Sequence, residues 1–304
     1  MSQEMMNTKE VAQYLGIHEK QVYILIKAQR IPATRITGKW VFPKHLIDEW
    51  IASNVKSGFG EAREKSRQVS GALLCAGSND LALDSLLTQM REIYPEYYFF
   101  SIVTGSTDGL KALNLGYADV AWSHLLDPET GEYNIPYLPV YLPNVKPVVV
   151  NLYHRKVGFI TAAGNPLQIK GFEDLARKDV RIVNRQKGSG IRVLFDYHLK
   201  QHAIPATKVH GYGREVWKHI EVGLSILAKE ADVGIAASAV ATMLGLHFIS
   251  ITEERFDMIL PESTFFSKPV QALITTLRSK PFQKRMAGLG SYLFSTSGDI
   301  LYPK

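Results

Sequence analysis

Four short polar loops carry the side chains best suited to holding a small ligand. They are built from Ser, Thr, Asn, His and Gly, and most of them join an apolar stretch to a predicted helix. The candidate residues are Ser78 and Asn79; Thr104, Gly105 and Ser106; Ser123 and His124; and Lys187, Gly188, Ser189 and Gly190. Helix N-termini present free amides and partial positive charge, and short hydroxyl side chains add donors. The loops therefore favour capture of a small anion by neutral donors.

Three charged or titratable side chains could assist these donors. Lys187 and Arg192 lie in or beside the fourth loop, and His219 is a further candidate contact for an anion. Taken singly, each loop is explained as well by an ordinary helix N-cap, and each histidine by a satisfied structural role. The predicted ligand site rests on the four loops together.

The elements that must position these loops alternate between strand and helix. Predicted strands cover residues 72–76, 98–103, 118–122, 180–183 and 231–235, and helices follow most of them. This alternation predicts an α/β fold with a mostly parallel sheet, in which ligands bind beyond the carboxyl ends of the strands. Two matching segments, Ala118-Asp-Val and Ala231-Asp-Val, suggest two similar lobes.

The remaining elements are expected to cross between the lobes or to close the fold. Paired strands are predicted at 148–153 and 157–161 and again at 247–251 and 255–260. Helices are predicted at 215–229, 236–244, 269–277 and 281–292.

The sequence offers little support for catalysis or for a metal site. It has no Gly-x-Ser-x-Gly elbow, and no Gly-Lys-Ser/Thr follows Gly188. His198 and His202 stand four residues apart but lack the glutamate of a zinc protease, and Cys75 is the only cysteine. We expect no catalytic residue, no metal and no cofactor.

Residues 8–50 have a different organisation, of two short helices, a hairpin and a closing helix. Thr8 is a suitable N-cap and Gly16 a suitable end for the first helix. Pro43 fits the first turn of the closing helix. The second helix and the hairpin carry side chains that reach phosphates or base edges: Lys20, Gln21, Tyr23, Lys27, Arg30, Arg35 and Lys39.

The distribution of charge agrees with contact to nucleic acid in this first quarter. The chain has 304 residues and a net charge of +6, with 46% apolar and 21% charged residues. Residues 1–70 contain 11 Lys and Arg against 7 Asp and Glu. This excess is small, so we expect double-stranded DNA to be bound by a homodimer or higher homo-oligomer. No stretch is apolar enough for a membrane span or a secretory signal, which predicts a cytoplasmic location and no membrane partner.

The N-terminal order of elements closely resembles the winged helix-turn-helix of the excisionase and MerR-like family. The resemblance covers about the first fifty residues and implies DNA binding; a small three-helix domain that binds protein is the alternative. We predict a DNA-binding domain at 1–53, a linker at 54–71 that includes a short helix, and a ligand domain at 72–304.

The second domain resembles the periplasmic-binding-protein-like domain of the molybdate-binding type. The resemblance is carried by Gly77-Ser-Asn-Asp80, Thr104-Gly-Ser106 with the segment 110–120, Lys187-Gly-Ser-Gly-Ile-Arg192, Trp217-Lys-His219 and Ala231-Asp-Val-Gly-Ile235. It implies a type II, two-lobed domain that closes at a hinge on a small oxyanion such as molybdate or tungstate.

Together the two halves predict a one-component transcriptional regulator that senses a small oxyanion. An excisionase-like recombination accessory factor, a sensor of a small organic anion, and an enzyme with a protein-docking module remain alternatives.

Overall fold

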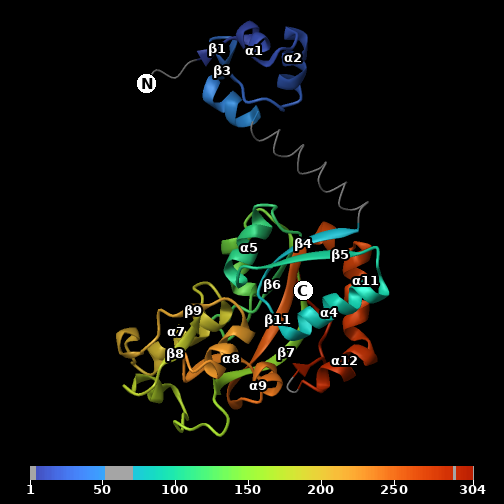
Figure 1. Cartoon of the computed structure of the whole chain (residues 1–304). Coiled ribbons are helices and arrows are strands. Elements are labelled where there is room, and N and C mark those ends of the chain that lie inside the picture. Colours follow the sequence, from blue (N-terminus) through green and yellow to red (C-terminus); the bar gives the residue numbers. More distant parts are fainter. Residues whose placement is uncertain (1–4, 52–70, 290–291, 304) are drawn as a thin grey trace. The chain divides into compact units, whose positions relative to one another are not determined.

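The computed structural model describes residues 5–51, 71–289 and 292–303 (Figure 1). The chain divides into two compact units, Met1–Val69 and Ser70–Lys304. Most of the predicted linker, including its short helix, lies outside the described residues.

The N-terminal unit packs helices around a small three-stranded sheet of order β1-β3-β2. Its elements are β1 (Met5–Met6), α1 (Thr8–Leu15), α2 (Glu19–Lys27), β2 (Thr34–Ile36), β3 (Lys39–Pro43) and a helix over residues 44–51. Val11, Val22, Phe42 and Ile47 are fully buried in its core. One apolar residue from each of four elements therefore holds the unit together.

The ends of two helices differ from the prediction by one residue. Asn7, not Thr8, caps α1, because its side-chain oxygen accepts from the amides of Lys9 and Glu10 at 2.9 and 3.0 Å. The Glu10 carboxylate accepts in return from the amide of Asn7 at 2.8 Å, which completes a capping box. Pro43 ends β3 opposite Met5 and precedes the closing helix instead of starting it.

The predicted wing is confirmed as a two-residue hairpin. Arg35 lies opposite Trp40, and Ile36 opposite Lys39. The residues between them, Thr37 and Gly38, have φ angles of 47° and 82°. Two successive positive φ angles match the twist of the strands they connect, and Gly38 adopts such an angle without strain.

The C-terminal unit is built on one curled sheet whose strands follow the order β5-β4-β6-β11-β7-β10-β8-β9. Lobe 1 carries β4 (Ala72–Gly77), β5 (Tyr98–Val103) and β6 (Val120–Ser123). Lobe 2 carries β8 (Ile182–Arg185), β9 (Glu215–Val216) and β10 (Val233–Ala237). Strands of the same lobe are parallel, as predicted.

Two long antiparallel strands, β7 (Pro147–Thr161) and β11 (His247–Pro261), run through both lobes. Each was expected as two short strands, and their antiparallel pairing makes the sheet mixed instead of mostly parallel. Their register shifts between Ser250 and Thr252 and between Phe256 and Asp257. Such bulges bend a sheet locally, and the segment between them, which joins the two lobes, is here called the hinge. The short strands β12 (Tyr292–Leu293) and β13 (Ile300–Tyr302) pair with β7.

Helices cover both faces of each lobe. Lobe 1 is covered by α4 (Leu81–Ile93), α5 (Ser106–Asn114), η1 (Ile135–Tyr137), α6 (Leu138–Tyr141), α10 (Glu262–Phe265), α11 (Lys268–Arg278) and α12 (Lys280–Ala287). Lobe 2 is covered by η2 (Phe172–Ala176), α7 (Gly190–Gln201), η3 (Ala206–Lys208), α8 (His219–Leu227) and α9 (Ser238–Leu244). The predicted helix at 215–229 was too long, because Glu215 and Val216 extend the sheet. The predicted last helix also ends early, and Tyr292 lies in β12.

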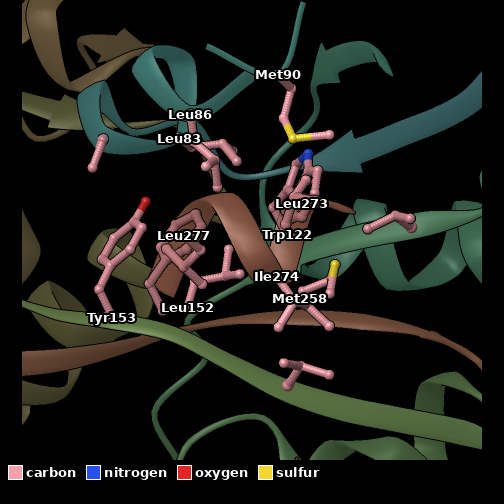
Figure 2. Close-up of a cluster of buried hydrophobic side chains, with 14 of the residues drawn as sticks. Leu83, Leu86, Met90, Trp122, Leu152, Tyr153, Met258, Leu273, Ile274 and Leu277 are labelled. Carbon is pink, nitrogen blue, oxygen red and sulfur yellow. The ribbon is translucent and has the colours of Figure 1, made fainter. Parts of the chain in front are cut away.

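The largest core joins α4 and α11 to the sheet of lobe 1. Figure 2 shows Leu83, Leu86 and Met90 of α4 facing Leu273 and Leu277 of α11. Each of these five residues is at most 1% exposed. Burial of this kind contributes about 2 kcal/mol for each large apolar side chain, so α11, near the C-terminus, is an integral part of lobe 1.

The repeated Ala-Asp-Val segment makes the same contact in both lobes. The Asp119 carboxylate accepts from the amide of Leu74 at 2.8 Å, and the Asp232 carboxylate accepts from the amide of Arg181 at 2.9 Å. Asp119 directly precedes β6 and Asp232 directly precedes β10, so each aspartate ties the start of its own strand to the chain beside it. The sequence echo therefore reflects a shared structural role.

Candidate ligand site between the two lobes

The first three predicted loops meet at the carboxyl ends of the strands of lobe 1. The hydroxyl oxygens of Ser78 and Ser106 lie 2.8 Å apart and share a hydrogen bond. Ser106 Oγ also accepts from the amide of His124 at 3.2 Å. All three residues are buried. Loops that are distant in sequence thus converge on one point.

The fourth loop, from lobe 2, is seated against the same point. The amide of Thr107 donates to the carbonyl of Gly188 at 3.3 Å. A Cβ atom on Gly190 would lie 2.5 Å from the carbonyl oxygen of His124, which leaves no room for a side chain. The two lobes are therefore in direct contact here, in a closed arrangement.

Two residues that the sequence analysis did not select supply the strongest donors of this region. Arg185 ends β8 and Gln186 follows it, and each is only 2% exposed. Among the described residues, neither Arg185 Nη1 nor Gln186 Nε2 has a hydrogen-bond partner. Gln186 Nε2 lies 3.3 Å from where a Cβ on Gly105 would be. Arg185 and Gln186 come directly before Lys187 in the chain. Their position at the end of a buried strand was the sequence signal that could have identified them.

The charge of Arg185 is poorly compensated. Its other nitrogens donate only to neutral oxygens, including the carbonyls of Val216 and Trp217 at 3.3 and 2.6 Å. Burial, together with the nearby charge of Arg155, lowers the pKa of Arg185 to about 9. A buried guanidinium in this state is stabilised by any anion that approaches Nη1.

Arg155, at the centre of β7, has the opposite character. Its guanidinium pairs with Asp80 of lobe 1 and with Glu254, its register partner on β11, and Nε donates to Glu254 at 2.6 Å. Burial would lower the pKa of Arg155, but Glu254 and Asp80 raise it overall. Although burial acts against ionisation of Glu254, Arg155 and His124 hold its pKa at about 2. This ion pair is a fixed part of the hinge.

Two buried histidines complete the region and are held neutral. His124 Nδ1 lies 3.0 Å from Glu254 Oε2, while His219 Nδ1 accepts from the amide of Ala237 at 3.1 Å. Burial lowers the pKa of both side chains, and the charge of Arg185 lowers each further. A neutral imidazole adds polar contacts without adding charge.

The other predicted ligand residues have different partners. Asn79 donates to Asp84, Ser123 to Asn134, and Thr104 weakly to the carbonyl of Gly105. Ser189 caps α7 by accepting from the amide of Arg192 at 3.1 Å.

The two cations that were predicted to assist the site also do not join it. Arg192 is saturated by Asp196 and Glu215, and Lys187 is exposed. Of the four predicted serines, Ser78 and Ser106 therefore converge, and Ser123 and Ser189 are used elsewhere.

The candidate DNA-binding side chains in the N-terminal unit are all exposed. They comprise Lys20, Gln21, Tyr23 and Lys27 on α2, Arg30 after it, and Arg35 and Lys39 on the hairpin. Gln21 also accepts from the amide of His18 at 3.2 Å, which ties it to the start of α2. On the same helix Val22 is fully buried, so α2 has one core face and one free polar face.

Sequence models of two known domains match the chain. The model of the PBP superfamily domain matches residues 87–278. The chain belongs to the PBP superfamily. A helix-turn-helix domain matches residues 5–55. The two domains together fit a DNA-binding regulator with a ligand-binding domain. The match identifies no ligand, so the molybdate-binding type remains a prediction.

Two relatives in sequence resemble the chain to different extents. The uncharacterized protein YvgK of Bacillus subtilis (strain 168) is 29% identical over 300 residues, which cover 96% of each chain. A Clostridium pasteurianum protein from the 5′ region of a 2Fe-2S ferredoxin gene is 24% identical over 110 residues, covering 36% of this chain and 97% of its own.

Solved structures share the fold. A putative phosphate transporter substrate-binding protein from Clostridium perfringens, solved with bound phosphate, has a TM-score of 0.53 at 13% identity and covers 73% of this chain and 98% of its own. A mutant of Corynebacterium glutamicum OxyR has a TM-score of 0.51 at 16% identity, covering 93% of this chain and 90% of its own. At these identities the likeness concerns the fold alone.

No described helix is long and apolar enough to cross a membrane. Within the same residues, His, Cys, Asp and Glu form no group of three or more that could hold a metal ion.

Proposed function

We propose that the protein is a transcriptional regulator that binds operator DNA through its helix-turn-helix and senses a small oxyanion between its two lobes. The observation that carries the ligand class is the pair of buried donors, Arg185 Nη1 and Gln186 Nε2, that have no partner among the described residues. An unpaired buried donor costs about 1–3 kcal/mol, and more when it is charged. An anion with several acceptor oxygens would recover that energy from both groups at once.

The same contacts favour a small ligand. Gly190 leaves no space beside His124 for a side chain, so the room between the lobes at this point is limited. Ser78 and Ser106 would redirect their shared hydrogen bond towards an acceptor. Because Arg185, Gln186, Ser78 and Ser106 can all donate hydrogen bonds, a compact tetrahedral oxyanion such as molybdate or tungstate would match them well. Closure on the ligand would then change how the DNA-binding domains are presented.

Calorimetric titration of the full chain with molybdate, tungstate, sulfate and phosphate tests the ligand class. Phosphate is included because the structural relative from Clostridium perfringens was solved with it. We expect heat of binding and a raised melting temperature with at least one of these anions. If none produces either signal, the oxyanion proposal fails, and small carboxylates are the next class to titrate.

A matched pair of arginine variants tests the assigned donors. Arg185→Lys keeps the charge but loses the Nη1 donor, and we expect ligand affinity to fall about 10-fold or more. Arg192→Lys removes an equally buried arginine whose nitrogens already bind Asp196 and Glu215. This variant should lower the melting temperature and leave affinity nearly unchanged. Equal losses of affinity in both variants would contradict the assignment.

A further inference from the structure

The two ends of the ten-stranded sheet are protected very differently. At one end, β9 has only two residues, and its Glu215 is ion-paired with Arg192. At the other end, β5 has six residues, Tyr98–Val103, none of them charged. No strand in the described part of the chain pairs with the outer edge of β5. Native sheets shield open edges with short strands or charged side chains, and β5 has neither.

The face of β5 next to this edge is also largely exposed, and the guanidinium of Arg91 on α4 covers only the ring of Tyr98 at one end, with its central carbon 4.0 Å from the ring centroid. Tyr98, Phe100 and Ile102 alternate along the strand, so they share one face, and they are 41%, 57% and 64% exposed. The helix that follows β5, α5, packs on β4 and β6. Phe99 points to the opposite face, where it packs against the core of lobe 1. Three large apolar side chains in a row beside an open edge form a coherent interaction surface.

We propose that this surface binds a second copy of the same chain, with β5 pairing antiparallel to β5 of that copy. A twofold axis at Phe100 places Phe100 opposite itself and Tyr98 opposite Ile102. A twofold axis brings two copies of the same strand together, so charged residues in the strand would lie beside like charges of the other copy. The absence of charge from β5 makes it complementary to itself. The contact also closes after two copies, so it gives a dimer and not a filament.

The path of the chain favours a second copy over an unrelated partner. Ala72, the first residue of β4, pairs with Tyr98 at one end of β5, so the two copies of Ala72 would lie at opposite ends of the joined strands in the twofold pair. In each copy, the segment 52–70 precedes this point in the sequence. Each spans up to roughly 65 Å when extended, and helix-turn-helix half-sites lie about 34 Å apart. Pairing through β5 thus allows two weakly basic DNA-binding domains to reach neighbouring half-sites.

A cysteine cross-link tests the geometry directly. In Phe100→Cys, oxidation of the full chain should give a disulfide-linked species of twice the 34.0 kDa chain mass. The natural Cys75 is buried, which raises its thiol pKa well above the ordinary value and keeps it unreactive. Leu224→Cys, at a 50% exposed position of α8 in lobe 2, is the matched control. No cross-link at position 100, or equal cross-linking of the control, would overturn the proposal.

Light scattering with a charged variant provides a second test. The wild-type chain should have twice the 34.0 kDa mass, and Phe100→Lys should have the single mass. Leu224→Lys should behave as wild type. A wild-type monomer at every concentration, or a dimeric Phe100→Lys, would refute the β5 interface. Binding of an anion is measured separately and should survive in Phe100→Lys, so failure of the dimer and failure of the ligand proposal are distinguishable.

Discussion

Arg185 and Arg155 show how two buried arginines in one region take opposite roles. Arg155 has two carboxylate partners, which raise its pKa and fix it in the hinge. Arg185 has carbonyl partners and one donor that no described residue accepts from, and burial lowers its pKa to about 9. Each charge of a buried ion pair already has its partner, whereas a buried cation that lacks a carboxylate partner can bind an anion from outside the protein.

The sequence identified the loops of the site better than the individual side chains in them. Ser78, Ser106, His124 and His219 were chosen for their residue types, and the fold brings them together. Ser189 was chosen on the same grounds, but its oxygen serves the helix it begins. Arg185 was missed because strand-end position, burial and lack of a partner are properties of the folded chain. Residue type alone does not show whether a hydroxyl or a guanidinium is already bonded.

The neutral state of His219 predicts a specific loss of stability in acid. Burial, with the charges of Arg185 and Arg155, lowers the pKa of His219 well below its ordinary value. Below about pH 6.5 the unfolded chain therefore takes up a proton that the folded chain does not, and stability falls by up to about 1.4 kcal/mol per pH unit. His219→Asn, whose side-chain oxygen can replace Nδ1, should lose less stability between pH 7.5 and 5.5, measured by urea unfolding.

Two other groups define the limits of this experiment. His124 also has a lowered pKa, so the variant should retain part of the acid sensitivity. The pKa of Glu254 is about 2 in the folded chain and about 4.3 in the unfolded chain. Ionised Glu254 therefore stabilises the fold above about pH 4.3, and this stabilisation is lost only as the pH falls from about 4.3 towards 2. The window from pH 7.5 to 5.5 therefore reports on histidines. An unchanged slope in His219→Asn would contradict the neutral assignment.

At the scale of elements, the closed arrangement depends on the start of α7. Gly190 opens this helix and meets His124 from the other lobe, so the absence of a side chain at this position permits the lobes to touch. The alternating strand and helix pattern predicted a helix after this loop, where α7 lies. It did not predict that β7 and β11 each continue through both lobes, because polar residues separate the two apolar halves of each strand. Arg155 and Glu254 fill that break, and their ion pair allows charged residues to remain inside a buried strand.

Gly190→Ala should hold the lobes apart without unfolding either of them. The added methyl group would lie 2.5 Å from the His124 carbonyl oxygen, which is backbone and has little freedom to move. We expect weaker ligand binding and a larger radius of gyration by X-ray scattering, with helix content unchanged. Gly213→Ala is the matched control, because a Cβ there meets nothing within 4 Å. A ligand affinity equal to that of the control would show that closure at Gly190 is unnecessary for binding.

At the scale of the whole molecule, regulation requires the ligand and the DNA to affect each other. A ligand shifts a conformational equilibrium only by its difference in affinity between the states. In the proposed regulator, the donors that distinguish the closed state are Arg185 and Gln186 of lobe 2 together with Ser78 and Ser106 of lobe 1. The candidate DNA-binding groups are on α2 and the hairpin, in the other compact unit. The two activities should therefore be separable by substitution.

Two variants should fail in opposite ways when binding to the DNA upstream of the protein's own gene is measured by fluorescence anisotropy. Lys27→Ala removes an exposed cation from α2, so DNA affinity should fall and the slope of log affinity against log salt should decrease by about 1. Its ligand affinity should be unchanged. Arg185→Lys should bind DNA as the wild type does without ligand, but addition of the anion should no longer alter that binding. If the anion still changed DNA binding in Arg185→Lys as strongly as in the wild type, the signal would have to originate outside the candidate site, and the regulator would work by another route.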